Sequence, residues 1–155
     1  MKRFAEYICW GIFWLYVWGL FAVLFFGRTS DLEIPIKEYF SCYANLEPLK
    51  TLTRYIRYAF AKKNAESLLL AFLNIGGNFI LFLPMGFFLP CLFRNLRSAA
   101  RTFCVVAFII FSSEIFQGVF RIGVPDIDDF LMNLSGALIG FLVAKLFRFC
   151  EGMLS

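Results

Sequence analysis

Residues 113–140 read SEIFQGVFRIGVPDIDDFLMNLSGALIG, a polar turn set between two apolar segments of a hydrocarbon-rich chain. After Ser113, its polar side chains are Glu114, Gln117, Arg121, Asp126, Asp128, Asp129, Asn133 and Ser135. A charged side chain at the centre of a membrane helix costs roughly 2.5–3.5 kcal/mol on insertion scales. A membrane protein keeps such groups where they pair, face a cavity or perform a function. The stretch therefore predicts two neighbouring membrane helices with a functional site between them.

The composition of the whole chain indicates a membrane protein. Of its 155 residues 61% are hydrophobic, whereas a soluble domain is closer to half apolar. The long apolar runs fall at about 7–26, 67–93, 102–120 and 130–147. Each run has about the length that crosses a bilayer core of about 30 Å at about 1.5 Å per residue. The sequence predicts an all-α membrane protein with one domain over 1–155 and four transmembrane helices.

The first apolar run, about 7–26, could be mistaken for a signal peptide. It is too long for the hydrophobic region of such a peptide, and no Ala-x-Ala cleavage site follows it. We therefore expect a retained helix.

Several classes of function are disfavoured by composition. The chain has no histidine, the commonest general base and a common metal ligand. Its five cysteines form no Cys-x-x-Cys pair, and most lie in or beside apolar runs, where free cysteine packs as a small hydrophobe. The net charge of +4 comes without a basic, aromatic-interleaved soluble patch, so we expect no nucleic-acid partner. We also expect no cofactor and no metal, since the three aspartates lack a metal-specific spacing.

The loop 28–66 contains a basic amphipathic pattern. One helical face carries Lys50, Arg54, Arg57 and Ala61, and the opposite face carries Leu49, Leu52, Ile56, Ala59 and Phe60. This pattern predicts a helix that lies in the membrane interface, with a plain solvated helix as the alternative.

Two patterns predict contacts between the membrane helices. Asn74 and Asn78 lie one turn apart in the second span, and we expect their face to point at other helices rather than at lipid. In the fourth span, Gly136 and Gly140 form a Gly-x-x-x-Gly pair that permits a close helix approach.

The distribution of Lys and Arg predicts the orientation. The totals on the two sides are nearly equal, so they do not decide it. Two basic segments favour an orientation with both termini in the cytoplasm. They are the pair Lys2 and Arg3, and the purely basic loop with Arg94, Arg97 and Arg101. This multi-pass orientation places the aspartate turn and the amphipathic segment together at the outer face.

The polar residues form one constellation in the predicted fold. Glu114, Gln117 and Arg121 follow an i, i+3, i+7 spacing, which predicts one face of the third helix. The aspartates lead into the fourth helix, Asn133 lies one turn into it, and Asn78 of the second helix could add a third wall. One interpretation is an ion-paired network around Arg121. The other is a pocket for a polar head group or a sugar.

Three blocks of this chain resemble the VanZ-like family of small bacterial membrane proteins. They are NLEPLKTLTRYIRY at 45–58, NIGGNFILFLPMGFFLP at 74–90 and the stretch at 113–140. The matching positions are Asn45, Leu46, Pro48, Gly77, Asn78, Phe82, Pro84, Gly86, Glu114, Gln117, Arg121, Asp126, Asp129, Asn133 and Gly136. Leu49 stands where the family usually has Phe, and Arg28 resembles the arginine that follows the family's first helix.

The resemblance implies a location in the bacterial plasma membrane and a link to teicoplanin resistance, for which the family is named. The favoured function is binding of a lipid-linked or lipophilic cell-envelope molecule, such as a cell-wall precursor or a lipoglycopeptide. One alternative is an enzyme acting on a polyprenyl or phospholipid head group, with Glu114 or an aspartate as base and Arg121 on phosphate. The other is a small lipid transporter, which requires an oligomer. Membrane lipids are the expected partners, and the oligomeric state is left open.

Overall fold

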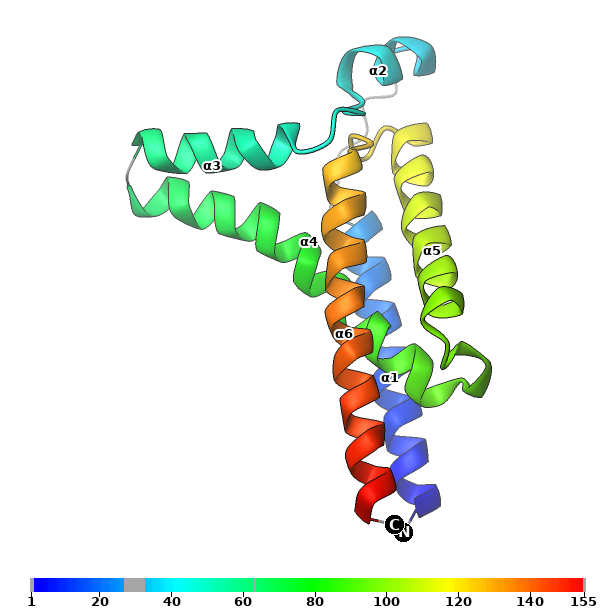
Figure 1. Cartoon of the computed structure of the whole chain (residues 1–155). Coiled ribbons are helices and arrows are strands. Elements are labelled where there is room, and N and C mark those ends of the chain that lie inside the picture. Colours follow the sequence, from blue (N-terminus) through cyan, green and yellow to red (C-terminus); the bar gives the residue numbers. More distant parts are fainter. Residues whose placement is uncertain (1, 27–32, 63, 155) are drawn as a thin grey trace.

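The computed structural model describes residues 2–26, 33–62 and 64–154, and this part of the chain folds into helices without a β-sheet. Figure 1 shows α1 (Lys2–Phe25), α2 (Ile36–Tyr43), α3 (Lys50–Lys62), α4 (Ala65–Leu92), the short 3₁₀ turn η1 (Arg94–Leu96), α5 (Ala99–Val119) and α6 (Ile127–Leu154). Four segments are long and apolar enough to cross a membrane, namely Glu6–Phe25, Ala65–Leu92, Ala99–Val119 and Ile127–Cys150. The prediction of an all-α protein with four membrane helices is confirmed.

Helices α1, α5 and α6 run up and down while α4 crosses them obliquely, and the molecule has two distinct ends (Figure 1). The two termini lie side by side at one end, and α2, α3 and the α5–α6 turn lie at the other (Figure 1). The basic connection between α4 and α5 lies toward the end that holds the termini (Figure 1). Which end faces the cytoplasm stays a prediction.

Glycines bring α4 and α6 together as the most extensive helix pair of the bundle. A Cβ on Gly136 would collide with the carbonyl oxygen of Phe79. A Cβ on Gly140 would collide with that of Leu83, and Gly86 makes a similar approach from α4. The glycine pair predicted from the sequence therefore acts in packing, because only a hydrogen lets the two backbones meet.

The core of the bundle lies among α1, α4, α5 and α6. Phe82, Val106 and Ile110 are fully buried there, and Phe13 of α1 is buried beside them. Many large apolar side chains on the outer faces of the long helices remain exposed, as lipid-facing residues are. This distribution fits four spans that pack on a narrow interior seam.

The helix α3 and the first half of α4, residues 50–62 and 65–76, form a hairpin that projects sideways from the bundle (Figure 1). We call this hairpin the arm. Helix α3 packs on α4 and buries Thr51 and Ala59, whereas Arg54 and Phe60 stay exposed. Because α3 runs roughly perpendicular to α6, beside the end of the bundle, and leaves apolar surface uncovered, its placement supports the predicted interfacial helix (Figure 1).

Helix α4 bends between the arm and the bundle (Figure 1). Pro84 lies inside this helix and removes one backbone hydrogen bond, which is the commonest cause of a kink. In the turn before it, Tyr16 of α1 donates a hydrogen bond from its Oη to the carbonyl oxygen of Leu81 at 2.8 Å. The bend turns the second half of α4 into the bundle.

Helix α2 was not predicted. It has only eight residues, too few for a periodic pattern to stand out in a mixed sequence. Its Tyr39 is buried and donates a hydrogen bond from Oη to the carbonyl oxygen of Gly123 at 3.2 Å. The contact holds α2 on the α5–α6 turn, which a sequence pattern could not reveal.

Candidate functional site

The turn between α5 and α6 is shaped by its own backbone. After the end of α5, Arg121 adopts a φ of 54° and its N–H bonds the carbonyl of Gly118 at 3.2 Å. The N–H of Ile122 reaches back to the carbonyl of Gln117 at 2.9 Å. This left-handed residue satisfies the last carbonyls of α5 and stops the helix.

The expectation that Arg121 shares a face with Glu114 and Gln117 is wrong. Helix α5 ends at Val119, so the i+7 spacing no longer applies at Arg121. Its buried Nε lacks a hydrogen-bond partner, and it forms no ion pair with any residue in the described ranges. The interpretation as an ion-paired network around Arg121 is therefore not supported.

Asp126 holds the start of α6 and the segment before α3. Its Oδ1 accepts from the N–H of Asp128 at 2.9 Å, which is a helix N-cap, and from Nδ2 of Asn45 at 2.9 Å. Its Oδ2 accepts from the hydroxyl of Thr51 at 2.5 Å. Two backbone hydrogen bonds of 2.9 Å join the same segments: the N–H of Asn45 donates to the carbonyl of Pro125, and the N–H of Ile127 donates to the carbonyl of Asn45. With three accepted bonds, the Asp126 carboxylate is a structural tie.

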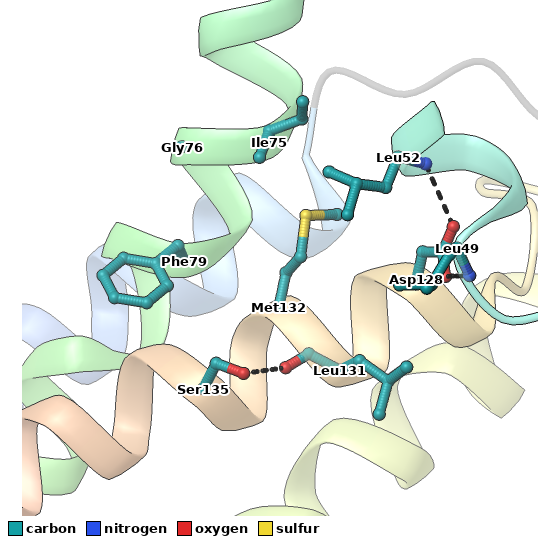
Figure 2. Close-up of a pocket in the computed structure, with 9 residues that line it drawn as sticks. All are labelled: Leu49, Leu52, Ile75, Gly76, Phe79, Asp128, Leu131, Met132 and Ser135. Carbon is teal, nitrogen blue, oxygen red and sulfur yellow. Dashed lines mark hydrogen bonds between the residues drawn. The ribbon is translucent and has the colours of Figure 1, made fainter. Parts of the chain in front are cut away.

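Asp128 caps α3 from a different helix. The side chain is only 2% exposed, and its oxygens accept from the N–H of Leu49 at 2.5 Å and from the N–H of Leu52 at 3.0 Å. Figure 2 shows both bonds at the first turn of α3. A carboxylate is favourable there because the first N–H groups of a helix lack partners and carry partial positive charge. Asp128 thus holds the arm to the bundle.

A first cavity, of about 370 Å³, lies where the arm meets α6 (Figure 2). Its lining is apolar, with Leu52, Phe79 and Met132 among the side chains. The two polar members, Asp128 and Ser135, are both engaged, the latter donating from Oγ to the carbonyl of Leu131 at 2.8 Å. This cavity offers no unused polar group, so it is not the candidate site.

A second cavity, of about 500 Å³, lies among α3, α4, α5 and α6 at the end opposite the termini, and we call it the polar cavity. The predicted residues that line it are Asn45, Asn78, Glu114, Gln117, Asp126, Asp129 and Asn133. Arg121 and Asp128 do not line it, and Arg28 lies outside the described residues. The structure therefore gathers most of the predicted constellation around one space.

The floor of the polar cavity joins α4 to α6. Nδ2 of Asn78 donates to Oδ1 of Asp129 at 2.5 Å, so Asn78 does form a wall beside the aspartate. One turn along α6, Asn133 is only 3% exposed and its Oδ1 has no hydrogen-bond partner. A buried acceptor without a donor is costly and marks a place where a bound molecule could supply one.

The α5 side of the polar cavity is held by two hydrogen bonds. Oε2 of Glu114 accepts from the N–H of Asp126 at 3.3 Å. Gln117 is only 5% exposed and donates from Nε2 to the carbonyl of Leu24 at 2.8 Å. Leu24 lies in the last turn of α1, where carbonyls have no partner within the helix. Gln117 therefore ties α1 to α5 at the cavity wall.

The rim of the polar cavity includes residues that the sequence had not assigned to the site. These are Cys42, Tyr43, Lys50, Thr51, Arg54, Tyr55 and Asn74. Lys50 and Arg54 belong to the basic face that was attributed to the membrane interface alone. Nδ2 of Asn74 donates a hydrogen bond to the carbonyl oxygen of Leu70 in the same helix at 2.8 Å, and Asn74 also lines the cavity. A rim with two cations above a floor with carboxylates suits a ligand with both anionic and donor groups.

Comparison with known proteins agrees with the fold and with the motifs. A family model described as VanZ/LLP1 matches residues 13–148, from the first half of α1 to the second half of α6. No curated protein and no solved structure matches the chain. The family match covers nearly the whole chain and reaches into all four spans, and the chain therefore belongs to the VanZ/LLP1 family of membrane proteins.

Proposed function

We propose that this membrane protein binds a lipid-linked or lipophilic cell-envelope molecule in the polar cavity and does not transform it. The observation that carries the proposal is a polar cavity of about 500 Å³ at one end of an otherwise apolar bundle. A cavity of this size is typical of small-ligand sites, and its few polar groups would orient a head group.

The engagement of two aspartates supports binding over catalysis. Asp126 accepts three hydrogen bonds, from Asn45, Thr51 and Asp128. Asp128 accepts two more from the backbone of α3. A general base needs a free acceptor within reach of the substrate proton, and these carboxylates are occupied by the scaffold.

Binding at the outer face would lower the access of glycopeptides such as teicoplanin to the envelope. This consequence rests on the predicted orientation, which places the polar cavity outside, and on the family resemblance. It also implies that lipid and cell-wall precursor profiles stay the same with and without the protein.

The test compares lipids that co-purify with the protein in native nanodiscs, measured by mass spectrometry. We expect one class to be enriched with the wild-type chain and lost with Asp129→Ala. Ser135→Ala is the matched control, since Ser135 lies on the same helix outside the polar cavity. Equal enrichment with Asp129→Ala would contradict the proposal. A changed lipid profile in cells would favour an enzyme, and teicoplanin susceptibility of the same strains tests the consequence.

A further inference from the structure

An apolar groove runs along the outside of the bundle between α1, α4 and α5. Its volume is about 590 Å³, and its lining includes Val17, Phe21, Leu24, Leu89, Ser112 and Phe116. Phe21 and Phe116 are roughly half exposed, so the groove is accessible from the side of the spans. We call it the chain groove.

The chain groove meets the polar cavity at the end of α1. Leu24 lines both spaces. On α5, Ser113 and Phe116 line the groove, whereas their neighbours Glu114 and Gln117 line the polar cavity. The two spaces therefore share Leu24 as a common wall residue, one space being apolar along the spans and the other polar at their end.

The length of the chain groove fits a hydrocarbon chain of one leaflet. Along α1 its lining extends from Phe13 to Phe25. Twelve residues at about 1.5 Å each give about 18 Å. Half of a bilayer core is about 15 Å thick. A chain that starts at the polar cavity would therefore reach about the bilayer centre.

The polar cavity restricts the head group. Oδ1 of Asn133 is buried without a partner, and it needs a hydrogen-bond donor such as a hydroxyl. At the rim, Lys50 is ion-paired with Glu47 at 3.1 Å, and the guanidinium of Arg54 favours an anion, for which phosphate is the common lipid group. A head group with phosphate and hydroxyls meets both requirements, and a trimethylammonium head group, which has no donor, does not.

We infer that the site takes one phospholipid with a hydroxyl-bearing anionic head group, of the phosphatidylglycerol class. The head group occupies the polar cavity, and one acyl chain lies in the chain groove. The glycerol that links them lies beside Leu24 and Gln117, whose hydrogen bond ties α1 to α5. This inference rests on the proposed function and adds to it the class of ligand and the place of its chain.

The experiment places the full chain in phosphatidylcholine nanodiscs with a small fraction of phosphatidylglycerol that carries a diazirine in one acyl chain. Photo-crosslinks should concentrate on residues 13–25 of α1 and 108–116 of α5, and unlabelled phosphatidylglycerol should compete. Phosphatidylmethanol, which keeps the phosphodiester anion but has no hydroxyl, should compete less, and phosphatidylcholine least. Equal competition by all three would overturn the head-group assignment, and stronger competition by a polyprenyl phosphate sugar would replace the phospholipid.

Two matched substitutions test the chain groove. Val17→Trp fills it, whereas Val23→Trp adds the same bulk on α1 at a 57% exposed position outside it. We expect Val17→Trp to weaken crosslinking about ten-fold, equivalent to losing burial of about two methylene groups, and Val23→Trp to leave it unchanged. Ser112→Trp fills the groove from α5 and should repeat the loss if Val17→Trp disturbs folding. Crosslinking that is unchanged in both groove variants would overturn the inference.

A head-group variant separates this inference from the proposed function. Asn133→Leu should abolish the preference for phosphatidylglycerol while the protein keeps its thermal stability. If Asn133→Leu loses lipid and the groove variants keep it, the polar cavity binds the head group and the chain groove does not hold an acyl chain. If Asn133→Leu and Asp129→Ala both retain lipid as wild type does, the proposed function fails as well.

Discussion

The two sets of polar groups on α6 differ in what satisfies them. Asp126 and Asp128 form the tie set, and their carboxylates are engaged with the loop before α3 and with α3 itself. The floor set is Asp129 and Asn133, within two turns of them; Asp129 accepts a hydrogen bond from Asn78, and Asn133 keeps a buried oxygen without a partner. Residues of similar chemistry thus serve different purposes. The tie set accepts hydrogen bonds from the arm and from the segment before it, although Asp126 also lines the polar cavity, whereas Asn133 in the wall of that cavity keeps an unused acceptor.

The largest expected effect comes from cutting the tie set at Asp128. Asp128→Ala leaves the N–H groups of Leu49 and Leu52 without their acceptor, which should cost about 2–4 kcal/mol of stability. Thermal unfolding in detergent measures the loss, and proteolysis within 50–62 reports release of the arm. Asp128→Asn, which keeps one acceptor oxygen, should lose about half as much. An unaltered melting temperature in Asp128→Ala would show that the arm is held by packing alone.

A smaller loss is expected at the other tie. Thr51→Val keeps the shape of a 6% exposed side chain but removes the hydroxyl that donates to Asp126. We expect about 1–2 kcal/mol of destabilisation in the same unfolding measurement, because the carboxylate loses one of three donors. Thr53→Val, whose exposed hydroxyl bonds only carbonyls of its own helix region, is the control and should change little. Equal effects of the two substitutions would remove the distinction between the tie and an ordinary surface hydroxyl.

A substitution in the floor set should not lower the stability of the protein, in contrast to substitutions in the tie set. Asn133→Leu removes a buried acceptor that lacks a partner, so stability should stay constant or rise by about 1 kcal/mol. Lipid retention in nanodiscs should fall at the same time. A large loss of stability would place Asn133 in the scaffold and end the contrast between the two sets.

The smallest effect is expected at Arg121. Its φ of 54° is strained for a residue with a Cβ, so Arg121→Gly should raise stability by up to about 1 kcal/mol. Arg121→Ala, which keeps the Cβ, should give no such gain. Lipid retention should be unchanged in both, since Arg121 does not line the polar cavity. A loss of lipid in both variants would show that the Arg121 side chain contributes to lipid binding.

The spans were predictable because they depend on local composition. Runs of about twenty apolar residues have few alternatives to a membrane helix, and the predicted 67–93 differs from the observed Ala65–Leu92 only at its ends. The packing role of Gly136 and Gly140 was also readable, since their four-residue spacing places both on one face.

Roles within the site were less predictable, because they depend on partners far away in the chain. Asp126 meets Thr51 across 75 positions, and Asp128 meets Leu49 across 79. No periodicity could show that α3 would be capped by α6. The prediction that Arg121 shares a helical face with Glu114 was wrong for a related reason. The end of α5 depends on the α5–α6 turn, and that turn is completed by contacts with α2 and Asn45.

The sequence by itself determined the class of the protein, the four spans and the set of polar residues that meet at one end of the bundle. Hydrophobic length and helical spacing are local quantities, so they can be read without the fold. Only the tertiary structure decided which of those residues tie the arm, which line the polar cavity, and that an apolar groove adjoins it at Leu24. Hydrogen bonds and cavities arise between segments, and they exist only once α1, α3, α4, α5 and α6 are placed against one another.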